Sequence, residues 1–135
     1  MGAWGPGLFE DDTALDFVLE LKQQSDAGLL LRSVTEAANS PTSVDYEGGT
    51  RALAAAEVIA ALGKRPAKDL PDEVSEWLSN RGIHFSTHLG ATAIAAVEKV
   101  QTASEISELW AESPESALWR ENVADLLARL RAASQ

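Results

Sequence analysis

The 135-residue chain contains no cysteine. This absence excludes disulfide bonds, thiolate zinc sites and a cysteine nucleophile, and a chain of this length buries enough surface to fold without cross-links. The chain also lacks any apolar run near the roughly 18 residues of a membrane-spanning helix, and its first residues lack the positive charge and apolar stretch of a secretory signal. We therefore expect one cytoplasmic domain with no membrane partner.

Basic residues are scarce. Eleven lysines and arginines face twenty-one aspartates and glutamates, which gives a formal net charge of -10. A field of this sign repels nucleic-acid phosphates and anionic lipids. Lys64, Arg65 and Lys68 form the one local basic cluster, and it has no interleaved aromatic residues. The composition predicts no nucleic-acid partner and favours a basic protein as the partner.

Strand signals are missing as well, because the chain has no useful alternating pattern and no Asn-Gly or Asp-Gly hairpin turn. Apolar residues instead recur at helical spacing between capping residues, glycines and prolines. These patterns predict helices over residues 12–24, 27–38, 50–62, 71–81 and 88–102, then from 104 and from 114, with the longest loop at 39–49 and a brief extended stretch at 83–86. We expect an all-α single-domain irregular bundle of six or seven helices, with a solenoid of helix pairs as the structural alternative.

The first nine residues hold three glycines and a proline, which preclude a helix there. The same segment carries Trp4, Leu8 and Phe9, each of which gains about 1.5–3 kcal/mol on burial. We expect this glycine-rich segment to be irregular but docked on the bundle, with Trp4 and Phe9 as its anchors.

Residues 51–62 are strong helix formers and are apolar almost all round, which is typical of a helix surrounded by others. Glu57 is the one ionisable residue between Arg51 and Lys64 in this segment. A buried carboxylate must be paired, hydrogen-bonded or protonated. We expect an ion pair with Arg51, Arg120 or Arg129, or a cap on free amides of the N-terminal segment.

Carboxylates gather in two further stretches that contain few or no bases. Asp12, Asp16 and Glu20 are spaced four apart and so share one helix face. We predict an acidic interaction surface made of Asp11, Asp12, Asp16, Glu20, Glu105, Glu108, Glu112 and Glu115. A row of acids also suits a hard divalent cation, but no calcium-loop pattern is present, so we expect no metal and no cofactor.

A catalytic or metal-binding alternative uses Asp16, Glu57 and His84 in a pocket between the N-terminal segment and the central helix. It requires these side chains to converge. His84 and His88 are spaced four apart, yet Phe85 follows His84 where a zinc protease has glutamate, and Gly82 and Ser86 place His84 in a loop.

The opening Met1-Gly-Ala-Trp-Gly-x-Gly-x-Phe9, with Glu10-Asp-Asp-x-Ala14-x-Asp16-Phe after it, resembles the start of a bacterial family of domains of unknown function. Further similarity lies in Ala54-Ala-Ala-Glu57-Val-Ile-Ala-Ala, Ser104-Glu-x-x-Glu-Leu-Trp110 and Trp119-Arg-x-x-Val-x-Asp125-Leu-x-x-Arg129-Leu. The resemblance implies no activity, cofactor or catalytic residue.

These observations favour a small acidic, non-enzymatic protein-binding module, similar in format to the immunity and antitoxin proteins of bacterial competition systems. The enzyme or metal protein described above is one alternative. A structural module that forms homo-oligomers is another, and it predicts a large apolar patch buried on self-association.

Overall fold

The computed structural model of the protein describes residues 5–135, so the predicted anchor Trp4 lies outside the described residues. Within this part of the chain the fold is all-α and forms a single-domain bundle, as predicted. Its seven helices are α1 (Asp12–Leu21), α2 (Gly28–Ala38), α3 (Tyr46–Leu62), α4 (Asp72–Ser79), α5 (Thr87–Thr102), α6 (Glu105–Ala111) and α7 (Ser116–Ala133).

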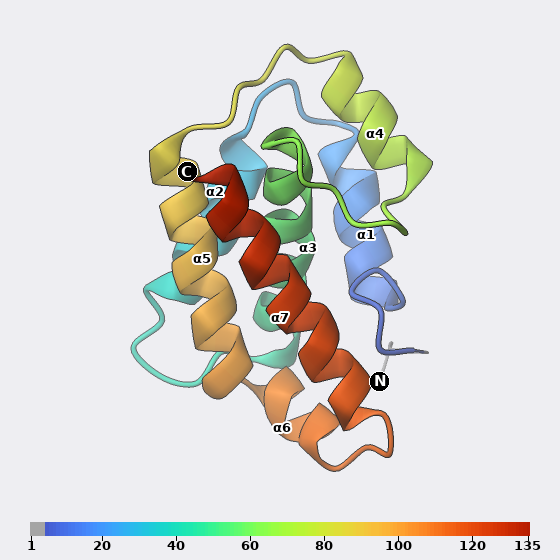
Figure 1. The fold of residues 1–135 in the computed structure, drawn as a ribbon, viewed down its shortest axis with the longest axis vertical. Coiled ribbons are helices and arrows are strands. Elements are labelled where there is room, and N and C mark those ends of the chain that lie inside the picture. Colours follow the sequence, from blue (N-terminus) through green and yellow to red (C-terminus); the bar gives the residue numbers. More distant parts are fainter. Residues whose placement is uncertain (1–4) are drawn as a thin grey trace.

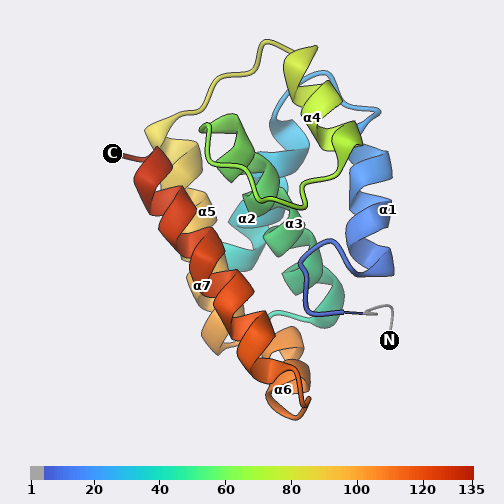
Figure 2. The ribbon, with the colours of Figure 1, turned by 45° about the vertical axis from the view of Figure 1, so that its right-hand side comes forward.

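Helix α3 is the centre of the bundle. It contacts each of the other six helices, and residues 52–60 are all buried. Figures 1 and 2 show α3 enclosed by α1 on one side, by α2 and α5 on another, and by α7 running diagonally across it. The prediction of a surrounded central helix is therefore confirmed.

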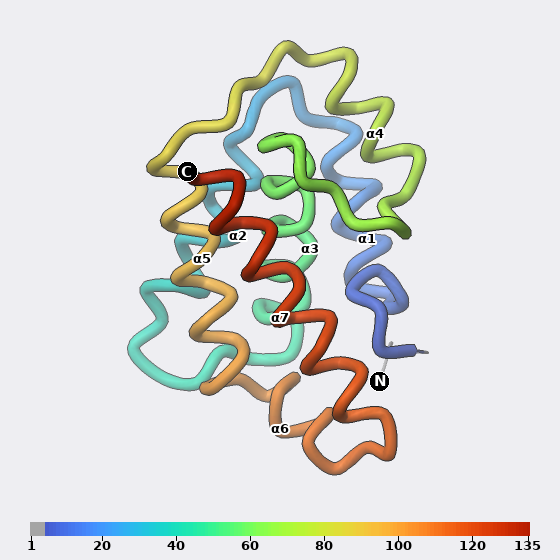
Figure 3. The backbone as a smooth tube through the Cα atoms, in the orientation of Figure 1, coloured from blue at the N-terminus to red at the C-terminus, as the bar shows by residue number. Residues whose placement is uncertain are grey.

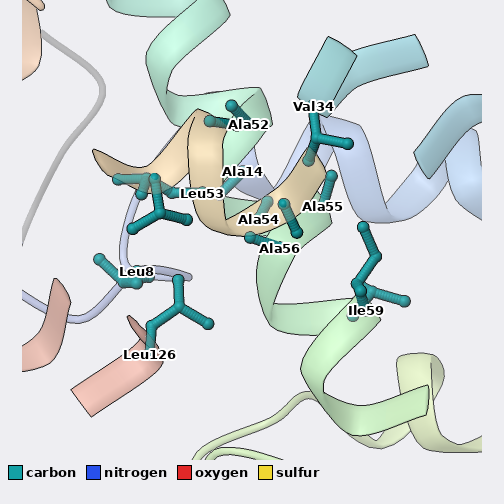
Figure 4. Packing of buried hydrophobic residues seen from close by; sticks show 14 of the residues in the cluster. Leu8, Ala14, Val34, Ala52, Leu53, Ala54, Ala55, Ala56, Ile59 and Leu126 are labelled. Carbon is teal, nitrogen blue, oxygen red and sulfur yellow. The ribbon is translucent and has the colours of Figure 1, made fainter. Parts of the chain in front are cut away.

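Small side chains allow this enclosure. Ala52, Ala54, Ala55, Ala56 and Ala60 each have no exposed surface, and Figure 4 shows four of them in the interior between neighbouring helices. Alanine keeps the radius of α3 small and is also the best helix former, so one residue type serves both packing and local structure.

Capping residues fix several helix starts where the sequence predicted them. The Asp11 carboxylate accepts hydrogen bonds from the backbone N–H of Thr13 and Ala14 at the start of α1. Ser86 caps α5 and Ser104 caps α6 in the same way. Each cap satisfies backbone donors that the first helical turn leaves free.

The start of α3 corrects the predicted 39–49 loop. Asp45 is the N-cap and accepts a hydrogen bond from the N–H of Gly48 at 2.7 Å, so the helix begins four residues before Thr50 and includes Gly48 and Gly49. A Cβ atom at Gly49 would lie 3.1 Å from Cγ2 of Ile106. The glycine here therefore permits close packing of α6 and does not break the helix.

Other boundaries also differ from the prediction. Helix α1 ends at Leu21 and not at residue 24, and α7 begins at Ser116, after a turn that holds Pro114. Residues 83–86 form no strand and lead directly into α5.

The end of α3 uses an unusual residue. Lys64 has a φ of 69°, and the N–H groups of Lys64 and Arg65 bond back to the carbonyls of Ala61 and Ala60. This is a Schellman ending in which lysine occupies the left-handed position that glycine usually takes. Gly63 precedes that position because a Cβ there would lie 2.6 Å from Cβ of Ala133 on α7.

Two chain connections meet at one end of the bundle. Val44, before α3, bonds through its N–H to the carbonyl of Ala103 at 3.0 Å, and its carbonyl accepts from the N–H of Glu105 at 2.8 Å. Figure 3 shows the α2–α3 and α5–α6 connections at this lower end. The starts of α3 and α6 are therefore held together.

The glycine-rich segment is docked, as predicted, over the residues that the structure describes. Gly5, Leu8 and Phe9 are buried, and the side-chain amide of Asn122 on α7 donates to the carbonyl of Pro6 at 2.9 Å. Phe9, the other predicted anchor, is 6% exposed.

Candidate functional site

The outer face of α1 carries two parallel rows of side chains. Leu15 and Leu19 form one row and are 40% and 57% exposed. Asp12, Asp16 and Glu20 form the other row and are also exposed. Residues three and four apart are neighbours on a helix surface, so the two rows lie side by side. We call these five residues the α1 outer face.

Packing on the opposite side of α1 explains why these leucines are left outside. Ala14, Phe17, Val18 and Leu21 are buried and attach the helix to the bundle. These four residues form the one buried face of this ten-residue helix. Leu15 and Leu19 lie off this stripe and are not among the buried core residues.

Arg51 does not pair with Glu57, which corrects one of the expected ion pairs. Its guanidinium lies 2.9 Å from the carboxylate of Glu20 and 5.3 Å from the centre of the Phe17 ring. Arg51 therefore ties α3 to α1 and partly neutralises one end of the acidic row. Asp12 and Asp16 have no ion pair within residues 5–135.

Asp11 is not part of an acidic surface, contrary to the prediction. It is only 4% exposed, because one carboxylate oxygen caps α1 and the other accepts a hydrogen bond from the hydroxyl of Tyr46. Burial, the bond to Asp11 and the charge of Asp11 raise the pKa of the Tyr46 hydroxyl, so it remains a donor. Asp11 is a structural carboxylate at the junction of α1 and α3.

The second acidic stretch lies around α6, at the lower end of the bundle in Figure 1. Glu105, Glu108, Glu112 and Glu115 are all exposed. Glu105 has a structural contact, since its carboxylate accepts from the backbone N–H of Tyr46 at 2.8 Å and so caps α3 from another helix. The other three have no ion pair among the described residues.

Glu57 is paired with Arg129, one of the three expected arginines. The pair is bidentate, with distances of 2.8 and 3.1 Å, and the Glu57 side chain is 4% exposed. The same guanidinium donates to Asp125 at 2.8 Å and to the carbonyl of Arg65 at 3.2 Å. Arg129 therefore joins α7 to the middle of α3 and to the loop that follows α3.

Burial and pairing act in opposite directions on this pair. Burial raises the pKa of the Glu57 carboxyl, while the hydrogen bonds and charge of Arg129 lower it, and burial outweighs them. For Arg129, burial lowers the pKa, but the bonds and charges of Glu57 and Asp125 outweigh that effect and raise it. Arg129 stays charged, and Glu57 is the member of the pair that tolerates neutralisation.

The residues of the catalytic alternative do not share a pocket. Glu57 lines a cavity of about 460 Å³ with residues of α7, of the N-terminal segment and of the α3–α4 loop. His84 lines a different cavity of about 430 Å³, and Asp16 is exposed on α1 and lines neither. Within residues 5–135, no group of three His, Asp or Glu side chains is placed to hold a metal ion.

The two histidines are also separate in their environment. His84 is exposed in the loop before α5, and His88 is exposed in the first turn of α5. His88 does not line the cavity that His84 lines. Their spacing of four therefore gives no common site.

Tryptophans of the described residues serve the core. Trp77, Trp110 and Trp119 are all less than 9% exposed, and the indole N–H of Trp77 donates to the carbonyl of Gln24 at 3.0 Å. The apolar groups available to a partner are therefore leucines. The sequence analysis did not identify Leu15 and Leu19 as surface residues. Their positions between the acidic residues and outside the apolar stripe of α1 do indicate that they face outward.

Comparisons with known proteins place the chain among domains of unknown function. A family model described as Domain of unknown function (DUF4259) matches residues 2–122. No curated protein and no solved structure matches the chain. In the described residues, no helix combines the length and the apolar character needed to cross a membrane.

Proposed function

The chain belongs to the DUF4259 family of domains of unknown function, and we propose that it is a non-enzymatic protein-binding module that docks a basic partner on the α1 outer face. The observation that carries this proposal is the pairing of two exposed leucines with an adjacent row of carboxylates on one helix. Leucines provide contact area that gains from burial, and the carboxylates select the charge of what approaches.

The proposed partner has a shallow apolar groove edged by lysines or arginines. Apolar residues at the centre of an interface with charged residues beside them are the usual anatomy of a protein-protein contact. Asp12 and Asp16 have no ion pair within the described part of the chain, so their charge is available to such a partner. Glu20 keeps its bond to Arg51 and contributes less.

The carboxylates around α6 would act at longer range. Glu108, Glu112 and Glu115 are exposed and have no ion pair within residues 5–135, and they add to the field of a chain with net charge -10. A field of one sign speeds the encounter with an oppositely charged protein without contributing contacts.

An immunity or antitoxin-like protein that neutralises a basic toxin or nuclease is the form of this function that we favour. A small acidic domain is complementary in charge to such a basic partner. The absence of a common pocket for Asp16, Glu57 and His84 supports a binding role over a catalytic one.

The test uses the purified chain as bait in an extract of its source cells. We expect retention of a protein with positive net charge, and its loss as salt rises toward about 0.5 M, where exposed charges are strongly screened. Leu15→Ser/Leu19→Ser and Asp12→Asn/Asp16→Asn should each weaken binding of the purified partner by about tenfold or more.

Leu118→Ser is the matched control, because Leu118 is 49% exposed on α7 and lies outside the α1 outer face. Equal retention by the α1 variants and the wild-type chain would overturn the proposal. Loss of concentration-dependent self-association in the Leu15→Ser/Leu19→Ser variant, with no foreign partner, would instead assign the α1 outer face to a homo-oligomer.

A further inference from the structure

The cavity beside Glu57 is built by four separate parts of the chain. Gly7 and Leu8 come from the N-terminal segment, Glu57 from α3, residues 66–69 from the α3–α4 loop, and Asn122, Asp125 and Arg129 from α7. Its volume of about 460 Å³ lies in the range of small-molecule sites, and a site at the junction of several elements is a common location for a ligand.

The polar groups of this cavity are mostly acceptors. Glu57, Asp69 and Asp125 supply three carboxylates, against the charges of Arg129 and Lys68. Arg129 has little left to donate, since its Nε bonds Asp125, its Nη1 bonds Glu57 and the carbonyl of Arg65, and its Nη2 bonds Glu57. Lys68 has no ion pair within residues 5–135, so an anion entering the cavity would find one free basic group against three carboxylates.

The carboxylates keep free acceptor positions. Asp69 has no ion pair within residues 5–135, and Asp125 is 67% exposed with one oxygen bonded to Arg129. A carboxylate oxygen accepts more than one hydrogen bond, so the rim can receive further donors. Leu8, Pro66 and Ala67 form the apolar part of the lining.

From this arrangement we propose that the cavity binds a small organic cation, with an ammonium or guanidinium group at Asp69 and Asp125 and an apolar body against Leu8 and Pro66. A metal ion is a poorer occupant, because the described residues hold no group of three carboxylates or histidines arranged for coordination. The site is separate from the α1 outer face and does not depend on the function proposed above.

The test is an NMR titration of the 135-residue chain with phenethylammonium, using phenethyl alcohol as the neutral probe and phenylacetate as the anionic one. With phenethylammonium we expect saturable chemical-shift changes at the backbone amides of Gly7, Ala67 and Asn122. The apparent affinities of the alcohol and of phenylacetate should be at least about fivefold weaker. The three probes share one ring, so the comparison isolates the charge.

Asp69→Asn should weaken ammonium binding by about five- to tenfold, because it removes one carboxylate without touching the Glu57–Arg129 pair. Glu121→Gln is the control, since Glu121 is exposed on the same helix as Asp125 and does not line the cavity. Equal binding of the alcohol and the ammonium, an unchanged affinity in Asp69→Asn, or no saturable shift in the wild-type chain would each overturn the proposal.

Discussion

Glu57 and Arg129 are unequal partners. Glu57 is nearly fully buried on α3, whereas Arg129 is 15% exposed and has further acceptors in Asp125 and the carbonyl of Arg65. Removing the arginine leaves a buried carboxylate without a counter-charge. Removing the carboxylate charge leaves an arginine that still has two acceptors and access to water.

Arg129→Met should therefore lower the free energy of unfolding at pH 7 by about 3–5 kcal/mol, the usual loss when a buried charge is left unpaired. Glu57→Gln should change it by no more than about 1 kcal/mol, because the amide keeps the shape and one acceptor. Urea unfolding of both variants and of the double variant Glu57→Gln/Arg129→Met measures the asymmetry. A larger loss in Glu57→Gln than in Arg129→Met would contradict it.

Burial of Glu57 also determines whether the free energy of unfolding rises or falls with pH. The pKa of Glu57 is raised in the folded chain above its usual 4.5, so the folded state holds the proton more tightly than the unfolded state does. This contribution to stability is fully present below about pH 4.5 and is lost as pH rises through the folded pKa. The free energy of unfolding of the wild-type chain, measured relative to Glu57→Gln, should fall as pH rises above about 4.5. A rise over this range would show that pairing with Arg129 outweighs burial.

The sequence identified Glu57 as a buried charge but did not determine its partner. Its type and its apolar surroundings are local properties and can be read from residues 51–62. The choice of Arg129 over Arg51 and Arg120 depends on how α7 crosses α3, which is a long-range property. Asp11 shows the same limit, because an acid that caps α1 also meets Tyr46 from a distant helix.

At the scale of elements, α3 depends on its small residues. Its neighbours approach from all sides, and the buried alanines leave no room for larger side chains. Dense packing of this kind makes the helix sensitive to added volume. The exposed alanines of α7 are not under this constraint.

Ala55→Leu should lower the free energy of unfolding by about 1–3 kcal/mol or more through overpacking. Ala128→Leu, on the exposed side of α7, should change it by less than about 0.5 kcal/mol, because the helix propensities of alanine and leucine are close. Urea midpoints of the two variants make the comparison. Similar effects at the two positions would argue against a fully enclosed α3.

Helix positions were predictable where capping residues and apolar spacing agreed. Ser86 and Ser104 mark the starts of α5 and α6, and the central helix was recognised from its composition. The start of α3 was missed because Gly48 and Gly49 suggest a loop when read locally. Close contacts explain both glycines, because a Cβ at Gly49 would lie 3.1 Å from Cγ2 of Ile106 on α6 and a Cβ at Gly48 would lie 2.8 Å from Oδ1 of Asp45.

At the scale of the whole molecule, ion pairs among the described residues involve only a minority of the acidic side chains. Five ion pairs are present among the described residues, and apart from the pair of Glu57 each has at least one partner that is substantially exposed. Exposed pairs contribute little, whereas a net charge of -10 repels itself across the surface.

Added salt should therefore stabilise the fold. Raising NaCl from about 20 to about 300 mM shortens the screening length from roughly 20 Å to roughly 6 Å, and the thermal midpoint should rise by a few degrees. The variant Glu108→Lys, which makes the net charge less negative by two without disturbing a described side-chain contact, should respond less. A midpoint that falls with salt would show that ion pairs outweigh repulsion.

The position of Arg129 determines how far this chain can be shortened from its C-terminal end. The family match ends at residue 122, inside α7, and the second half of that helix brings in Val123, Leu126, Leu127 and Leu130 as well as the counter-charge of Glu57. A fragment that ends at residue 122 would expose one side of α3 to water and leave the buried carboxylate of Glu57 without its counter-charge. A fragment of this chain should therefore extend to the end of α7 and not stop at the end of the family match.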